Sequence, residues 1–194
     1  MADARKRKNV LVGAPDIKAS GGLQLGKPAP ETTNHPTDAT AEVSSDLGLK
    51  AAGYVGEDGI SKTVDRTTEK IKDWNGDTVL VITSEHSVKL KLTFMESANA
   101  DVLKFVAGEN NVTEASGKIK IIDNADDLPH RCLNADIRGN AESKIRVFAP
   151  DAQVTNVGDV QYVRKDVIKY EVEIECFADS EGNKLYSFID RAEE

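Results

Sequence analysis

Three histidines and two cysteines are the side chains of this 194-residue sequence best suited to bind a metal ion or to act as a nucleophile. His35, His86 and His130 lack the HxH and HxxxH spacings that direct two imidazoles to one metal ion. Neither a cysteine–histidine nucleophile pair nor a GxSxG turn is recognisable. We therefore predict three surface histidines, two buried reduced thiols at Cys132 and Cys176, and no enzymatic activity, cofactor or metal centre.

Carboxylates and glycines form two weaker candidate sites. Asp123, Asp126 and Asp127 could bind calcium, but their spacing lacks the alternating oxygen ligands, the central glycine and the closing glutamate of a calcium loop. An ordinary acidic turn is the expectation there. The glycines between positions 21 and 26 have neither the Lys-Ser/Thr pair nor the strand–glycine–helix order of a phosphate-binding loop, so we predict no phosphate site.

Charge and hydropathy narrow the class of protein further. The net charge of −8 argues against a protein that grips nucleic acid over a broad face. No apolar run approaches the ~20 residues that span a bilayer, and no apolar segment of a secretory signal follows the basic N-terminus. We therefore predict no membrane role and folding in a cytoplasm. The basic run Arg5–Lys8 is expected to belong to a solvated terminal arm.

The stretch from Val88 to Gly108 must provide two kinds of element, because its hydrophobic period changes halfway along. Apolar and polar residues alternate up to Phe94, which is the pattern of a half-buried strand. Beyond it the apolar residues fall at helical spacing, Ser97 or Asn99 can cap the first turn, and Gly108 can end the helix. We predict one strand that leads into one short amphipathic helix, and no comparably clear helix elsewhere.

A long extended ribbon precedes this stretch. Ser61 to Trp74 combine threonine and valine with alternating charges, which favours a strand, although the segment EKIKDW would also suit a charged helix. Asn75-Gly76 is the strongest hairpin signal in the sequence, and Thr78–Thr83 is predicted to be the returning strand. His86 is predicted to lie in a turn beyond it.

The remaining strands are predicted from short alternating segments separated by turn residues. The clearest is Ile168–Phe177, whose even-numbered residues should face the core while Lys169 and three glutamates face outward. The fold class is thus mainly β: an antiparallel β-sandwich or barrel with one flanking short α-helix, a long loop and an N-terminal arm. We expect the arm over residues 1–20 and one domain over 21–194, which includes the extended loop and ribbon 28–76. The other predicted strands are Val10–Val12, Leu23–Leu25, Leu49–Val55, Lys118–Ile122, His130–Arg138, Lys144–Phe148 and Lys184–Ile189.

Several short motifs, taken together over most of residues 9–190, carry a family resemblance. They are the P-T-D-A segment Pro36–Ala39, the GYVGEDGI turn Gly53–Ile60, the Trp-x-Gly of Trp74–Gly76, and the strand end and helix Glu96–Gly108. In these features the sequence resembles the major tail tube proteins of long-tailed, non-contractile (siphovirus-type) bacteriophages. Each motif is short, and the inner tube of a contractile tail or of a secretion system is a close rival.

The resemblance implies a structural virion protein whose hexameric rings stack into the tail tube, the conduit for DNA ejection. It implies tape-measure, tail-tip and tail-terminator proteins as partners, passage of DNA without sequence-specific binding, and a location in the virion tail after assembly in the host cytoplasm. Physical reasoning agrees, since a ribbon charged on both faces cannot be buried in its own domain and can pair with a neighbouring chain. The long loop and the arm would then reach the next ring.

Two sets of residues follow as candidate sites. An acidic wall in the tube would let DNA slide, because a basic wall would hold the phosphates. The candidate residues for that wall are Glu171, Glu173 and Glu175, and those for subunit and ring assembly are Tyr54, Val64, Thr67, Ile71 and Trp74.

Two other classes share the predicted fold. A carbohydrate-binding or adhesion β-sandwich should display several aromatic side chains for stacking on sugars, and Trp74 is the sole tryptophan. A hydrolase or metal enzyme would need a cluster of ligands that the sequence lacks.

Overall fold

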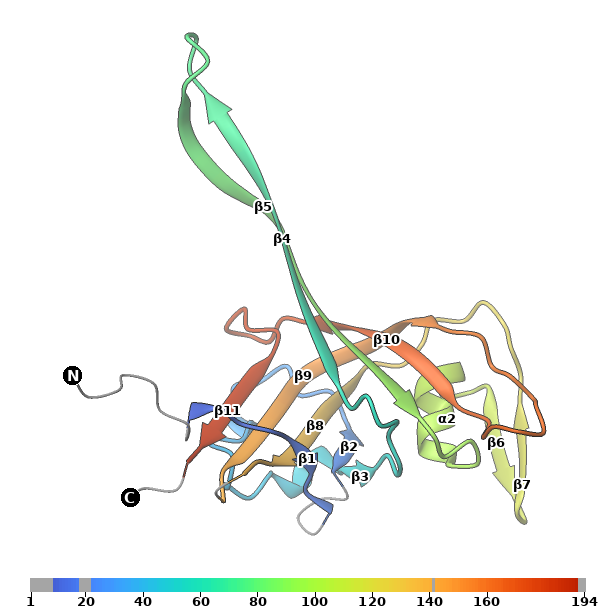
Figure 1. The fold of residues 1–194 in the computed structure, drawn as a ribbon. Coiled ribbons are helices and arrows are strands. Elements are labelled where there is room, and N and C mark those ends of the chain that lie inside the picture. The colour runs from blue at the N-terminus through green and yellow to red at the C-terminus, as the bar shows by residue number, and fades with distance from the viewer. Residues whose placement is uncertain (1–8, 18–21, 141, 192–194) are drawn as a thin grey trace.

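A computed structural model describes residues 9–17, 22–140 and 142–191 of the chain (Figure 1). Within them, strands form one nine-stranded antiparallel sheet and a separate two-stranded hairpin, and α2 (Ala100–Ala107) is the one α-helix of regular length. The mainly β antiparallel class with one short helix is thereby confirmed. The strands are β1 (Ala14–Pro15), β2 (Leu23–Gly26), β3 (Lys50–Ala51), β4 (Ser61–Lys72), β5 (Thr78–Phe94), β6 (Val112–Ala115), β7 (Lys118–Ile121), β8 (Arg131–Arg138), β9 (Lys144–Val157), β10 (Tyr170–Phe177) and β11 (Tyr186–Asp190). Two 3-10 turns, η2 (Thr32–Asn34) and η3 (Ser45–Leu47), lie in the long loop between β2 and β3.

The main sheet runs in the order β3-β2-β8-β9-β10-β5-β4. β1 also pairs with β8, and β11 also pairs with β9. Because β9 is 14 residues long, it pairs with β11 through Lys144–Phe148 and with β10 further along, through Asp151–Val157. β3 and β4 end the path, so their outer edges carry backbone groups with no strand partner among the described residues.

The core lies on one face of β5 and β10. Tyr170, Val172, Ile174 and Cys176 are buried and alternate with more exposed residues, which confirms the inward face predicted for this strand. They pair directly with the buried apolar residues of β5, Val88 to Phe94. Cross-strand pairs of this kind make the period of two in the sequence decisive for register.

Helix α2 contributes its apolar stripe to the same core. Four of its eight residues are buried, namely Val102, Leu103, Phe105 and Val106. The side-chain oxygen of Asn99 accepts hydrogen bonds from the backbone N–H groups of Asp101 and Val102. Gly108 ends the helix with φ of 110°. The predicted strand-to-helix unit is therefore confirmed. Of the two alternatives for the N-terminal cap, Asn99 is the one that caps the helix, and Gly108 ends it as predicted.

Several predicted strand limits were wrong. Val10–Val12 has no strand pairing, and the strand follows at β1. Within Leu49–Val55 only β3 pairs with β2, and Val55 makes an isolated bridge to Phe94. The expected strand Lys144–Phe148 continues to Val157, because a register shift beside Pro150 absorbs the residue that cannot donate to the ladder.

The turn predicted around His86 does not exist. β5 is one 17-residue strand that contains both Thr78–Thr83 and the stretch from Val88 to Phe94. A bulge takes the place of the expected turn: Thr67 pairs with Glu85 and Thr68 with Thr83, which leaves Ser84 without a partner residue. The Ser84 hydroxyl donates to the Thr67 carbonyl oxygen at 3.2 Å, so the polar residues read as a turn stabilise a bulge instead.

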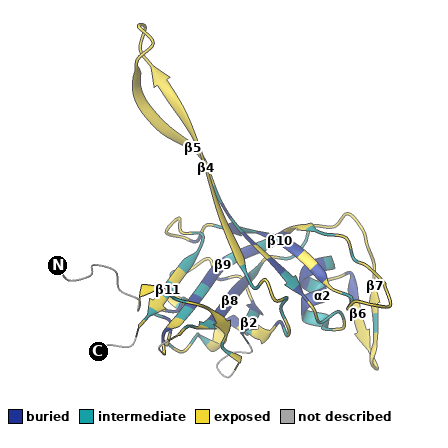
Figure 2. Cartoon of the chain, viewed as in Figure 1, coloured by how far each residue is buried: buried dark blue, intermediate teal, exposed yellow. Residues whose placement is uncertain are grey.

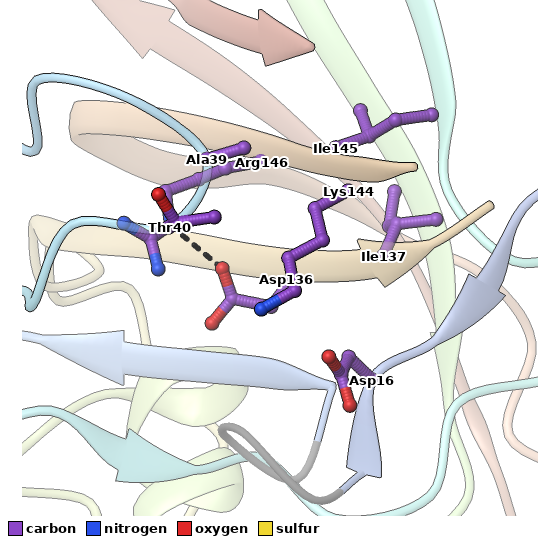
Figure 3. Close-up of a pocket in the computed structure, with 8 residues that line it drawn as sticks. All are labelled: Asp16, Ala39, Thr40, Asp136, Ile137, Lys144, Ile145 and Arg146. Atoms are coloured by element: carbon purple, nitrogen blue, oxygen red, sulfur yellow. Dashed lines mark hydrogen bonds and ion pairs between the residues drawn. The ribbon is translucent and has the colours of Figure 1, made fainter. Parts of the chain in front are cut away.

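The loop between β2 and β3 packs on the sheet of its own chain. The Arg146 side chain, on β9, donates three hydrogen bonds. One goes to the Asp136 carboxylate at 2.7 Å, and two go to the carbonyl oxygens of Asp38 and Ala41 at 3.1 and 2.6 Å. Figure 3 shows the contact between Arg146 and Asp136, and these residues line a small cavity of about 60 Å³. Residues 38–41 are therefore tied to the sheet of their own chain.

Candidate assembly interface

β4 and most of β5 form a two-stranded hairpin that projects from the body of the molecule (Figure 1). All 12 residues of β4 and the first nine of β5 are exposed, and Figure 2 shows the projecting part exposed over its whole length. The predicted ribbon, its strand conformation and its Asn75-Gly76 turn are confirmed. A two-stranded ribbon this long is marginal in water by itself, which indicates a surface that another chain covers.

Four of the five residues predicted for assembly lie on this hairpin. Val64 is 45% exposed and pairs with Val88 at the base, where the hairpin joins the core. Thr67 and Ile71 lie on the opposite face, because side chains alternate along β4. Trp74 lies in the turn at the tip and is fully exposed.

The returning strand makes the distal half of the hairpin apolar. Ile71 pairs with Leu80 and Glu69 with Ile82, so three apolar side chains share one face. Val81 lies on the other face opposite Lys70. All of these apolar side chains are between about 39% and 53% exposed, which leaves a patch that solvent alone covers.

Tyr54, the fifth predicted residue, lies elsewhere. It precedes β4 on the body, where its backbone N–H donates to the Glu96 carboxylate at 3.2 Å and its carbonyl oxygen accepts from Met95 at 2.9 Å. Its side chain is 74% exposed and borders a groove of about 740 Å³ between β1, β2 and the 53–60 loop. The structure therefore separates Tyr54 from the hairpin residues instead of bringing the five together.

The three glutamates predicted for an acidic wall lie in a row on the outer face of β10. Lysines of β5 lie beside them: Lys91 Nζ is 2.7 Å from the Glu171 carboxylate and Lys89 Nζ is 3.2 Å from Glu173. The hydrogen bond from Lys91 lowers the pKa of Glu171, and the hydrogen bond to Glu173 raises the pKa of Lys89. Glu175 accepts from the Ser87 hydroxyl instead. This face is therefore a mixed-charge surface, in which sequence reasoning noted the glutamates but not the paired lysines.

His35 corrects one prediction about the histidines. Its side chain is only 6% exposed, lies against the rings of Phe148 and Tyr186, and has Nε2 at 2.8 Å from the Ala29 carbonyl oxygen. Nδ1 faces the buried Asp179 carboxylate at 3.8 Å. The histidine is thus a packing residue that holds the loop, while His86 and His130 lie exposed as predicted.

Asp179 is a buried carboxylate beside His35. Burial alone would raise the pKa of Asp179, but hydrogen bonds from the Tyr186 hydroxyl and from the backbone N–H groups of Asn183 and Glu181 outweigh it and lower the pKa. The carboxylate closes the β10–β11 turn, which gives it a structural part.

Both cysteines are buried and free, as predicted. Burial raises the pKa of each thiol to about 12, so neither is a nucleophile at neutral pH. Within the described residues no three His, Cys, Asp or Glu side chains are grouped to hold a metal ion. The helices of the described part are too short and too polar to cross a membrane.

A family model described as "Phage tail tube protein" matches residues 28–193. The chain belongs to the phage tail tube protein family. It is therefore a β-rich structural protein of the virion tail and not an enzyme. The family match contains the hairpin, the helix and every strand from β3 to β11. No curated protein sequence matches the chain.

Three solved structures resemble this tail tube protein in part. A chain of the anti-feeding prophage tube-terminating cap is 9% identical, with a TM-score of 0.41, over 69% of this chain and 78% of that one. A chain of the extended PVC sheath–tube complex, from an extracellular contractile injection system, is 10% identical, with a TM-score of 0.42 over 71% and 86%. A chain of the PVC sheath/tube terminator is 7% identical, with a TM-score of 0.40 over 86% and 92%.

Sequence reasoning missed two parts of the candidate interface. The apolar segment Val79–Ile82 was assigned to a strand, but its exposure on both faces depends on the hairpin leaving the body. The groove beside Tyr54 depends on long-range pairing of β1 and β2 with β8. A signal for the first was present, since both faces of TVLVIT are apolar while its partner strand is charged.

Proposed function

We propose that this tail tube protein assembles into hexameric rings and that the rings stack into the tube of a long, non-contractile phage tail. DNA leaves the capsid through the tube. The single observation that carries the proposal is the projecting hairpin, whose exposed edge and apolar distal half require cover from other subunits. The non-contractile class is supported by the resemblance of the motifs at Pro36–Ala39, Gly53–Ile60 and Trp74–Gly76.

Ring closure proceeds by strand addition at the hairpin base. The outer edge of β4 offers backbone N–H and C=O groups to an edge strand of the neighbouring subunit, and a closed ring leaves no edge open. Val64, Thr67 and Ile71 lie along this edge, whereas Trp74 and Tyr54 lie beyond its two ends and contact other subunits. The same rule of closure makes a ring of fixed size rather than an open chain within each layer.

The tube interior is acidic in this proposal. A net charge of −8 repels phosphate, and Glu171, Glu173 and Glu175 are the candidate wall residues. Because Lys89 and Lys91 neutralise two of the three, the row repels DNA less strongly than three free carboxylates would. The row keeps a small net negative charge and offers no excess of basic groups to hold the phosphates of a passing duplex.

The division of the chain follows from the same assembly. Residues 1–20 serve as an arm that β1 attaches to the sheet beside β8, and residues 21–194 serve as the tube domain, with the loop and ribbon 28–76 making contacts between subunits. The tape-measure protein fills the tube before ejection, and tail-tip and terminator proteins bind its two ends.

Electron microscopy of the concentrated, purified protein tests the proposal. We expect six-fold rings or tubes with a central channel. Charge reversal of the row, with Glu171→Lys, Glu173→Lys and Glu175→Lys together, should give assembled particles that fail to eject DNA. A sheath around the tube in virions would contradict the non-contractile class, and rings of another symmetry would contradict the hexamer. Normal infectivity of the charge-reversed particles would remove the acidic wall from the proposal.

A further inference from the structure

The body carries a groove beside Tyr54 that could hold part of another molecule. The groove measures about 740 Å³ and lies between β1, β2, the C-terminal half of β8 and the 53–60 loop. A volume of this size lies within the ~300–1,000 Å³ of ligand-binding pockets in proteins. Its lining is mainly apolar and includes Pro15, Leu23, Val55, Ile60 and Ile137.

The tip of the hairpin carries the most exposed large apolar side chain of the described residues. Trp74 has its side chain fully in solvent, and Ile71 and Leu80 are about half exposed directly beside the turn. A tryptophan in a well-packed pocket is among the commonest anchors of protein interfaces. The turn itself is built to hold this position, because the Asp77 N–H donates to the Asp73 side chain and the Asp73 N–H donates to the Asp77 carbonyl oxygen.

The hairpin tip and the groove lie at opposite ends of the folded molecule. In Figure 1 the hairpin tip is at the top, whereas β1, β2 and β3, beside the groove, are at the bottom of the body. A tip cannot reach the groove of its own chain, so the contact must be head-to-tail between copies. Head-to-tail contacts that do not close generate open filaments, which is the geometry of stacked rings.

The charges on the two surfaces are mixed. Glu57 and Asp58 are exposed at the rim of the groove, and Lys70 and Lys72 stand on β4 just before the tip, so two pairs of opposite charge are available. Glu69, Asp73 and Asp77 are also exposed around the tip, so the apolar centre must hold the contact. Rim charges of this kind orient the contact.

We infer that the groove beside Tyr54 binds the Trp74 tip of a second copy of this chain in the next ring. The inference rests on the proposed function and deepens it, because it assigns the contact between rings to two named surfaces. Pairing along the β4 base closes each ring, and the projecting tip then extends beyond the body of its own ring. The stack is directional, since every subunit gives a tip to one side and a groove to the other.

Engineered disulfide bonds test the contact in assembled protein. The variant carries Asn75→Cys beside the intact Trp74 and Ala51→Cys in the wall of the groove. The native thiols are buried and will not compete. Mild oxidation of tubes should produce a ladder of dimers, trimers and longer chains on a non-reducing gel, because each copy is linked in both directions. Each single-cysteine variant, and Asn75→Cys combined with Tyr162→Cys outside the groove, are the matched controls.

A second pair of variants measures the anchor. Trp74→Ala should lower the yield of tubes by about tenfold or more and leave single rings, whereas Tyr162→Ala removes another highly exposed aromatic side chain and should leave the yield unchanged. Tubes without a ladder above the controls, or equal yields for the two alanine variants, overturn the inference while the proposed function stands. Failure of the unaltered protein to form rings or tubes contradicts the proposed function itself.

Discussion

The two halves of β5 are both rich in apolar residues but have opposite surroundings. Val88, Leu90, Leu92 and Phe94 are at most 4% exposed, because β10 and α2 complete a core around them. Val79 to Ile82 are between 39% and 68% exposed, although they are equally apolar and belong to the same strand. Sequence hydrophobicity therefore marks surface that must be covered. Whether the cover comes from the same chain or from another depends on topology.

The largest effect is expected from the buried half. Leu90→Ala should lower the free energy of unfolding by about 2–5 kcal/mol, because the removed atoms leave a cavity in a core that cannot fully collapse. Leu80→Ala is the matched change in the exposed half and should cost less than about 0.5 kcal/mol in the monomer. Urea denaturation of both variants measures the difference. Equal losses would mean that the hairpin folds back on the body and would break the comparison.

The order should reverse when assembly is measured. Leu80→Ala removes apolar surface that another subunit covers, so it should lower the yield of rings or tubes by about tenfold. Sedimentation of the assembled fraction is the measurement, at a temperature where Leu90→Ala remains folded. An assembly yield for Leu80→Ala that equals the yield of the unaltered protein would show that the distal half has no partner.

A second buried contact sharpens the contrast between the tied loop and the free hairpin. Arg146→Ala should destabilise the chain by about 3–5 kcal/mol, because it leaves the Asp136 carboxylate buried without its partner and releases residues 38–41. Arg164→Ala, at an exposed position of the 158–169 loop, is the control and should change stability by less than about 0.5 kcal/mol. A loss below about 1 kcal/mol for Arg146→Ala would mean that the loop is held by other contacts.

The ion pairs on the outer face should have a small, pH-dependent effect. The pKa of Glu171 is lowered in the folded chain, so its contribution to stability is present above the unfolded-state pKa and lost as the pH falls through the folded-state pKa. Glu171→Gln should therefore lower the melting temperature slightly at neutral pH and not at all in strong acid. Molar salt should shrink the difference at neutral pH, because both groups are exposed. A difference that grows on acidification would contradict the pairing.

The smallest change is expected at the thiols. Cys132 and Cys176 are buried and the pKa of each is raised to about 12, so a thiol reagent should label neither in the folded monomer at neutral pH. Labelling should begin only with global unfolding. Fast labelling of either residue in the native chain would mean that the core between β5, β8 and β10 opens locally.

Local pattern predicted most of the fold, and long-range pairing decided the rest. The alternation in Tyr170–Phe177 and the change of period before α2 specified those elements, because each is encoded within about ten residues. His86 was assigned to a turn because polar residues interrupt β5 there, and a bulge that tolerates an extra residue looks the same in sequence. The burial of His35 could not be predicted, since Phe148 and Tyr186 reach it only through the sheet.

The candidate interface was predicted in part for the same reason. The exposed hairpin follows from the Asn75-Gly76 turn and the charged pattern of β4, both of which are local signals. Lys91 and Lys89 lie beside Glu171 and Glu173 because of the register of β10 against β5, and local sequence does not determine that register. The groove beside Tyr54 depends on three strands from distant parts of the chain.

Removal of the projecting part of the hairpin tests the central claim most directly. Joining Asp65 to Ser87, which are paired neighbours, through an Asn-Gly turn keeps the base and deletes the distal half. Electron microscopy and denaturation of this variant beside the unaltered chain should find tubes for the unaltered chain, and a folded, equally stable protein that forms no tubes for the variant. Tubes of the shortened variant at undiminished yield would contradict the account.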